Sequence, residues 1–202
     1  MSDNWLYFVE GVYQTGQSAS DPLFGLQSTE DLEAWAARLQ FTYVFRDEND
    51  SRFQAEVLIA SGDPDRRSTT DTVAGNFPGT DDNAFNALGY AFTGVAFAPT
   101  LSNLVSIRAG GATFPWRSSE DYHDLQVGVD AILSFKESRT GGIDEPTNDE
   151  FFLGTEFDVY ANWRITSDLS ITSRYGLFLP GPAIPDPDYA RHFIYVGVTL
   201  AF

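Results

Sequence analysis

The 202-residue sequence has no cysteine, so it can form neither disulfide bonds nor thiolate metal sites. Basic residues are scarce as well, because only 12 Lys and Arg stand against 29 Asp and Glu, for a net charge of −17. Nucleic acid is therefore not an expected partner, since binding to phosphates needs basic patches. No apolar run approaches the roughly 20 residues of a membrane-spanning helix. A barrel strand needs only about 9–11 residues with one apolar face, so a membrane β-barrel is still allowed.

Aromatic residues are plentiful, at 15% of the chain, and apolar residues recur at every second position along most of it. This period of two is typical of β-strands with one apolar face. Residues 34–38 have some helical propensity, but Trp35, Ala37, Leu39 and Phe41 keep the strand period there. We expect eight strands within a single domain, 1–202, at about 4–15, 32–46, 51–61, 103–115, 123–137, 151–166, 169–180 and 191–202.

The predicted connections alternate in length. Segments 16–31, 62–102, 138–150 and 181–190 are long and rich in Gly, Pro, Asp, Asn and Thr, whereas 47–50, 116–122 and 167–168 are short. Long loops at one end and short turns at the other are typical of bacterial outer-membrane barrels. The sequence therefore predicts an all-β, antiparallel up-and-down transmembrane β-barrel with outer loops and periplasmic turns. Segment 62–102 is expected to plug or cap it, and the strand-like residues 88–98 are assigned to this loop.

The period alone does not tell which face points outward, because a soluble barrel places its apolar face inside. Several aromatic side chains near predicted strand ends favour lipid on the outside, as an interfacial belt would. They are Trp5, Trp35, Tyr43, Trp163 and Tyr175. A soluble β-barrel that binds an apolar ligand is the alternative with the faces reversed.

The predicted inward face carries charges of both signs. Its basic residues are Arg38, Arg52, Arg108, Lys136, Arg164 and Arg174, and its acidic residues are Glu10, Glu56, Asp130, Glu156 and Asp158. One interpretation is a conduit selective for an anionic chain, because the planar guanidinium binds carboxylates in bidentate fashion. The other is an internal salt-bridge network that fills a closed eight-stranded barrel, since buried charges there must pair. Such a plugged barrel would act as a surface anchor or binding protein through its loops.

The last predicted strand, 191–202, reads RHFIYVGVTLAF and sets Ile194, Val196 and Val198 on one apolar face. Its end resembles the insertion signal of outer-membrane barrels, which has a glycine six from the end, a hydrophobic residue third from the end and a terminal aromatic. Tyr195, Gly197, Leu200 and Phe202 match this signal, with Leu200 in place of the commoner aromatic. The resemblance implies that the barrel insertion machinery and outer-membrane lipid are partners.

Three segments, DLEAWAARLQFTY (31–43), LIASGDPD (58–65) and LGTEFDVYANWRITSDLSITSRYGLFLPG (153–181), resemble the alginate-export family of outer-membrane porins. The Ala-Ser-Gly-Asp run that closes a predicted strand is the most distinctive piece. The family implies passive export of an anionic polysaccharide through an Arg-lined channel. Its members usually have about twice this number of strands, so the chain is expected to match their C-terminal part or to be a small relative.

Catalysis has little support in the sequence. Of the two histidines, His123 lies beside a predicted turn, and only His192 could meet an outer-loop carboxylate such as Asp188. No serine nucleophile can be assigned to it, and phosphate-loop, zinc and nucleophile-elbow motifs are absent. Acidic outer loops could attract calcium, but they lack any calcium-binding spacing. We expect no enzyme, no catalytic residue and no cofactor.

Overall fold

A computed structural model describes residues 4–20, 27–66, 75–87 and 89–201. These residues form eight β-strands, as the alternating sequence predicts. The strands are β1 (Trp5–Ala19), β2 (Thr29–Val44), β3 (Arg52–Ala60), β4 (Leu104–Thr113), β5 (Leu125–Lys136), β6 (Phe152–Arg164), β7 (Leu169–Pro180) and β8 (Arg191–Leu200). None of the described segments is a helix long and apolar enough to cross a membrane.

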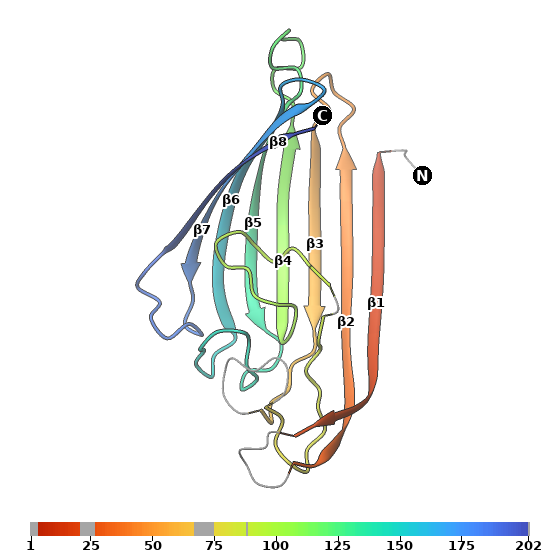
Figure 1. Ribbon diagram of the computed structural model, residues 1–202, viewed down its shortest axis with the longest axis vertical. Helices are drawn as coiled ribbons and strands as arrows, with labels where there is room; N and C mark the ends of the chain where they lie inside the picture. Colours follow the sequence, from red (N-terminus) through yellow and green to blue (C-terminus); the bar gives the residue numbers. More distant parts are fainter. Residues whose placement is uncertain (1–3, 21–26, 67–74, 88, 202) are drawn as a thin grey trace.

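The strands form one sheet in the order of the sequence, and each pairs antiparallel with the next. This confirms the all-β, up-and-down class. Connections at one end of the sheet are long and those at the other are short, and β1 begins and β8 ends on the short-turn side (Figure 1). Residues 89–98 form no strand and belong to the connection between β3 and β4, as expected.

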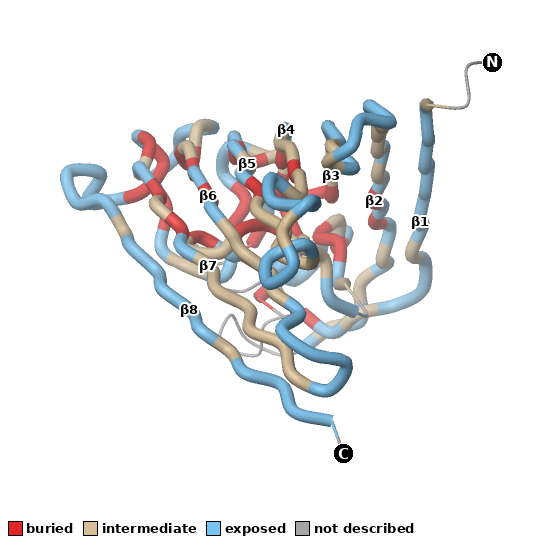
Figure 2. Tube along the Cα trace, turned by 90° about the horizontal axis from the view of Figure 1, so that it is seen from above, coloured by how far each residue is buried: buried red, intermediate tan, exposed pale blue. Residues whose placement is uncertain are grey.

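The sheet curves strongly from β1 round to β8 (Figure 2). Within the described residues no register joins β1 to β8, so the eight strands form an open curved sheet rather than a closed barrel. The two edge strands differ from the middle ones, since nearly all residues of β1 and β8 are exposed. β1 continues to Ala19 and β2 begins at Thr29, so this hairpin reaches further than its sequence pattern predicted.

The convex face of the sheet is apolar and exposed. Its large exposed side chains include Trp35, Leu39, Phe53, Ile107, Val129, Leu133, Phe157, Val159, Tyr175 and Leu179. The alternate residues point to the concave side and are mostly buried or half-buried, as Asp130, Ile132 and Ser134 of β5 show. The apolar stripe therefore lies on the outside of the curve, as expected for a sheet that faces lipid.

Aromatic rings gather on the sheet near its short-turn end. Trp5 lies opposite Tyr43 in the register, and their ring centroids are 4.4 Å apart. Further round the sheet, Tyr122 of the β4–β5 connection stacks on Trp163 of β6, with 5.1 Å between the ring centroids. Trp and Tyr favour the boundary between lipid and water because their rings are apolar with one polar atom.

Buried apolar residues lie toward the long-loop end, in two small clusters. One consists of Phe97, Leu104, Ile143, Leu153, Phe178, Ala183 and Ile184. The other consists of Ala34, Ala36, Ala60 and Phe85. Both join strands to the β3–β4 connection, which supplies Phe85 to one and Phe97 to the other. The chain between these two phenylalanines must therefore cross the concave side, and Figure 1 shows it in yellow-green in front of β3 to β5.

A candidate anion-binding site on the concave face

The register of the sheet brings polar residues from several strands into adjacent rows on the concave face. One row runs from Arg52 through Ala112, Gly128 and Tyr160 to Arg174. Small residues in this row make room for large ones, because a Cβ on Gly128 would overlap the ring of Tyr160. The Arg174 guanidinium lies 6.0 Å from the centre of that ring. The cross-strand register thus gathers two arginines and an aromatic ring from strands far apart in the sequence.

These rows line a pocket of about 270 Å³ on the concave face. Its lining residues are Arg52, Gln54, Phe92, Arg108, Gln126, Asp130, Tyr160, Asn162 and Arg174. Three guanidinium groups therefore share one space with a single carboxylate. Amide and phenol side chains supply further hydrogen-bonding groups, while Phe92 comes from the β3–β4 connection rather than from a strand. The pocket suits a carboxylated, hydroxyl-rich ligand, because guanidinium binds carboxylate and amides bind hydroxyl groups.

The arginines of this pocket are only partly engaged in internal ion pairs. Among the residues that the structure describes, neither Arg52 nor Arg174 forms an ion pair. Arg108 contacts Glu56 at 3.2 Å through one terminal nitrogen and lies 5.0 Å from the Phe92 ring, but its buried Nε has no hydrogen-bond partner. The pocket therefore holds donors that a bound anion could satisfy.

Arg38 instead forms an internal salt bridge, as in the second interpretation of the inward charges. Its guanidinium donates to Glu56 from Nε at 2.8 Å and from a terminal nitrogen at 2.6 Å. Glu56, which is almost fully buried, thus lies between Arg38 and Arg108. Glu10 is opposite Arg38 in the register and lines a separate cavity of about 290 Å³ beside β1 and β2.

Two predicted basic residues lie away from the pocket. Lys136, at the end of β5, is buried and donates to the carbonyl oxygen of Asn148 at 2.8 Å, so it ties down the β5–β6 connection. Arg164, at the end of β6, is exposed at the short-turn end, where it lines a shallow cavity beside Asp124. The predicted inward residues therefore do not share one site: some line the pocket, Arg38 forms a salt bridge, Lys136 holds a loop and Arg164 is exposed.

The two acids of β6 both face the concave side and are buried, but their contacts differ. Glu156 accepts three backbone hydrogen bonds from the β3–β4 connection, from Val95 at 2.5 Å and from Ala96 and Phe97 at 2.7 Å each. Asp158, opposite Asp130 in the register, accepts no hydrogen bond from the backbone of that connection.

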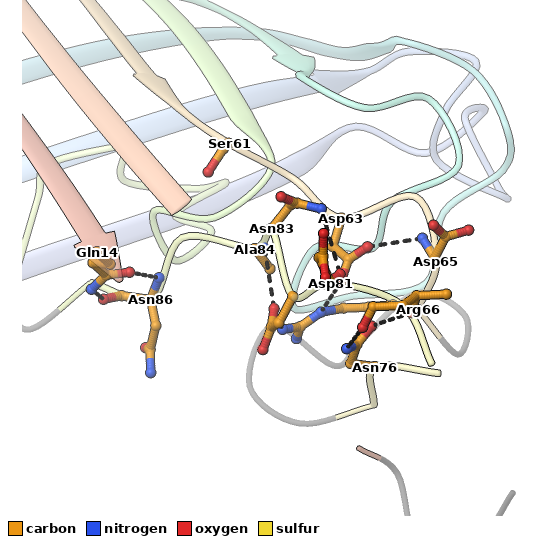
Figure 3. Close-up of polar contacts among 12 residues, drawn as sticks. Gln14, Ser61, Asp63, Asp65, Arg66, Asn76, Asp81, Asn83, Ala84 and Asn86 are labelled. Atoms are coloured by element: carbon orange, nitrogen blue, oxygen red, sulfur yellow. Dashed lines mark hydrogen bonds and ion pairs between the residues drawn. The ribbon is translucent and has the colours of Figure 1, made fainter. Parts of the chain in front are cut away.

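The Ala-Ser-Gly-Asp run, which begins at the last residue of β3, is part of a buried polar network at the long-loop end (Figure 3). Ser61 Oγ accepts a hydrogen bond from the Trp35 backbone at 2.9 Å. Asp63 accepts from the Arg66 guanidinium at 3.3 Å, and Arg66 also pairs with Asp82. Burial raises the pKa of Asp63, while the Asp65 backbone N–H and Arg66 oppose that rise. The run thus fixes the two ends of the β3–β4 connection rather than contacting the basic pocket.

Several contributors to the site could not be assigned from the sequence. Gln54, Gln126, Tyr160 and Asn162 lie on the polar faces of their strands, but nothing in the local sequence distinguishes them from other polar strand residues. Phe92 carries no signal at all, because its position depends on how a long connection folds back. His192 meets Tyr175, with 2.8 Å between Nδ1 and the phenol oxygen, rather than an acidic partner for catalysis. Across the described ranges, no three potential metal-ligating side chains gather into a cluster.

The fold and the concave face define a class, that of antiparallel up-and-down β-sheet proteins with an apolar convex face and a charged concave face. The sequence model of the alginate export family matches residues 1–192 of the chain. The chain therefore belongs to the alginate export family, as its resemblance to that family predicted. This is a family of export proteins rather than of enzymes. A search of curated proteins found no match.

Proposed function

We propose that the chain forms the wall of a porin-like channel in the bacterial outer membrane, through which an anionic polysaccharide leaves the cell. Membership of the alginate export family supports this, and so does the apolar convex face, which suits outer-membrane lipid as a partner. The observation that carries the proposal is the concave pocket, where Arg52, Arg108 and Arg174 surround a single carboxylate. In a uronate polymer every sugar unit carries a carboxylate, and these arginines would bind and release successive units.

A channel also requires the two edges of the sheet to be paired. Within a bilayer every backbone N–H and C=O needs a partner, so open sheet edges are not tolerated there. In the described residues, β1 and β8 leave one edge each without a neighbour. The proposal therefore includes pairing of these edges in the membrane, with one another or with further strands.

Ion selectivity in planar bilayers tests the channel. We expect a conducting, anion-preferring pore whose reversal potential moves toward cation preference in Arg52→Gln, in Arg174→Gln and most in the double variant. Arg139→Gln is the matched control, because Arg139 lies in the exposed β5–β6 connection and pairs with Glu150. A folded, inserted protein that never conducts would contradict the channel and favour a plugged surface anchor. Equal selectivity in all variants would contradict the role of the pocket.

We also propose that the last strand is read by the barrel insertion machinery through Tyr195, Gly197, Leu200 and Phe202. Phe202 lies outside the described residues. Tyr195 and Gly197 lie on the same face of β8. The Tyr195 ring covers Gly197, since a Cβ on residue 197 would be 2.5 Å from the phenol oxygen. In vesicles that contain the purified machinery, Leu200→Ala should slow insertion more than Thr199→Ala. Equal rates would contradict this recognition.

A further inference from the structure

The β3–β4 connection is attached to the concave face at two opposite places. At β1, the side-chain amide of Gln14 donates to the Asn86 carbonyl oxygen at 2.6 Å and accepts from the Asn86 N–H at 2.9 Å (Figure 3). At β6, Glu156 accepts from three successive backbone N–H groups. We call residues 86–87 and 89–97 the crossing segment, because they lie on the concave side between these two attachments.

The attachment at Glu156 depends on close approach of the backbone. A Cβ on Gly94 would overlap the Phe97 carbonyl oxygen and lie 2.9 Å from Glu156 Oε2. The carboxylate can therefore accept from Val95, Ala96 and Phe97 only because residue 94 has no side chain. Hydrogen bonds to an ionised carboxylate are stronger than neutral ones, and three of them on one side chain hold a segment firmly.

Glu156 also differs from its neighbour on the same strand face. Asp158, two residues further along β6, is equally buried but accepts no backbone hydrogen bond from the crossing segment. The crossing segment is thus held by one particular carboxylate rather than by the acidity of the strand. The apolar contact nearby, Phe97 stacked on Phe178 at 4.3 Å, fixes the end of the segment but not the residues before it.

The position of the crossing segment decides the shape of the basic pocket. Phe92 lies three residues before the Glu156 attachment, lines the pocket and lies 5.0 Å from the Arg108 guanidinium. On its other side the segment lines the separate cavity that contains Glu10, Arg38 and the exposed Tyr90. The segment therefore lines both the pocket that contains Arg52, Arg108 and Arg174 and the cavity that contains Arg38.

We infer that Glu156 is a positioning residue for substrate passage: it holds the crossing segment across the conduit, so that Phe92 narrows the basic pocket beside Arg108. This rests on the proposed channel function. Glu156 itself does not contact the transported chain. It sets the width of the path and the aromatic surface that a sugar ring meets next to the arginines.

Backbone hydrogen exchange of the membrane-inserted protein tests the attachment without any need for conduction. In Glu156→Ala, exchange of the Val95, Ala96 and Phe97 amides should accelerate by about 100-fold, as expected for loss of charge-assisted bonds. Glu156→Gln keeps one carbonyl acceptor and should show an intermediate acceleration. Asp158→Asn is the matched control and should leave these amides protected. Unchanged protection in Glu156→Ala, or an equal loss in Asp158→Asn, would overturn the inference.

Conductance then separates this inference from the proposed function. If the unmodified channel conducts, Glu156→Ala should raise single-channel conductance and weaken anion preference, and Phe92→Ala should raise conductance with the amides still protected. A conducting channel with identical conductance in Glu156→Ala would overturn the positioning role alone. A channel that fails to conduct in every form would overturn the proposed function, and with it the role in passage.

Discussion

The side chain of Asn103 occupies the space where a Cβ of residue 62 would lie. Asn103 is buried, has a positive φ of 50° and bonds to both backbone groups of Ser138, accepting at 2.5 Å and donating at 3.1 Å. Its own N–H donates to the Ser61 carbonyl oxygen at 3.1 Å. One asparagine thus joins the end of β3, the start of β4 and the end of β5, and Gly62 makes this possible.

Gly62→Ala should therefore destabilise the protein by about 3 kcal/mol, at the upper end of what overpacking a close contact costs. Urea unfolding in detergent micelles, followed by near-ultraviolet circular dichroism, measures the change. Gly89→Ala is the control, because a Cβ at residue 89 meets nothing within 4 Å. Equal stability of the two variants would contradict the close packing of Gly62 against Asn103.

Arg66→Met should cost about 3–5 kcal/mol at neutral pH, because it leaves the buried Asp63 and Asp82 without their shared cation. Burial already raises the pKa of Asp63, and removal of Arg66 raises it further. A raised pKa in the folded state means that the penalty is full above that pKa and fades as the pH falls toward the unfolded value. The loss measured by urea unfolding should therefore be smaller near pH 4 than at neutral pH. A loss that stays constant or grows on acidification would contradict this account.

The turn between β2 and β3 should respond to acid through Asp47. The Ser51 backbone N–H, which donates to its carboxylate at 2.8 Å, and then the Ser51 hydroxyl lower the pKa of Asp47. A lowered pKa in the folded state stabilises the turn above the unfolded pKa, and this contribution is lost as the pH falls through the folded value. In the nuclear magnetic resonance spectrum, the Ser51 amide proton should titrate with a midpoint below about 3.9, the ordinary value for Asp. In Asp47→Asn this titration should vanish, and its persistence would contradict the assignment.

The strands were predictable because each carries its own signal. Leu125, Val127, Val129 and Ala131 alternate with polar residues, and the observed β5 follows that alternation with the apolar set outward. The lengths of the predicted loops likewise indicated that all long connections would lie at one end of the sheet. The extra reach of the β1–β2 hairpin was missed, because Gly16, Gln17 and Ser18 lack strand propensity and are held by pairing with β2.

The candidate site was predictable only in part. Arg52, Arg108 and Arg174 line the concave pocket, but the strand period could not tell them from Arg38, which pairs with Glu56. That difference depends on the register between strands, which periodicity alone does not define. The role of Glu156 was hidden for another reason. Its partners are backbone groups about 60 residues earlier, and any sequence at those positions offers the same N–H groups.

The most direct test of the central claim is whether the convex face of the sheet meets lipid while the concave face meets water. The chain has no cysteine, so single-cysteine variants at the adjacent residues Val129 and Asp130 can each carry one spin label. In the membrane-inserted protein, we predict that the label at 129 is relaxed by oxygen dissolved in lipid and the label at 130 by a water-soluble nickel complex. The opposite pattern, or water access at both positions, would contradict a channel wall with an apolar exterior and a charged interior.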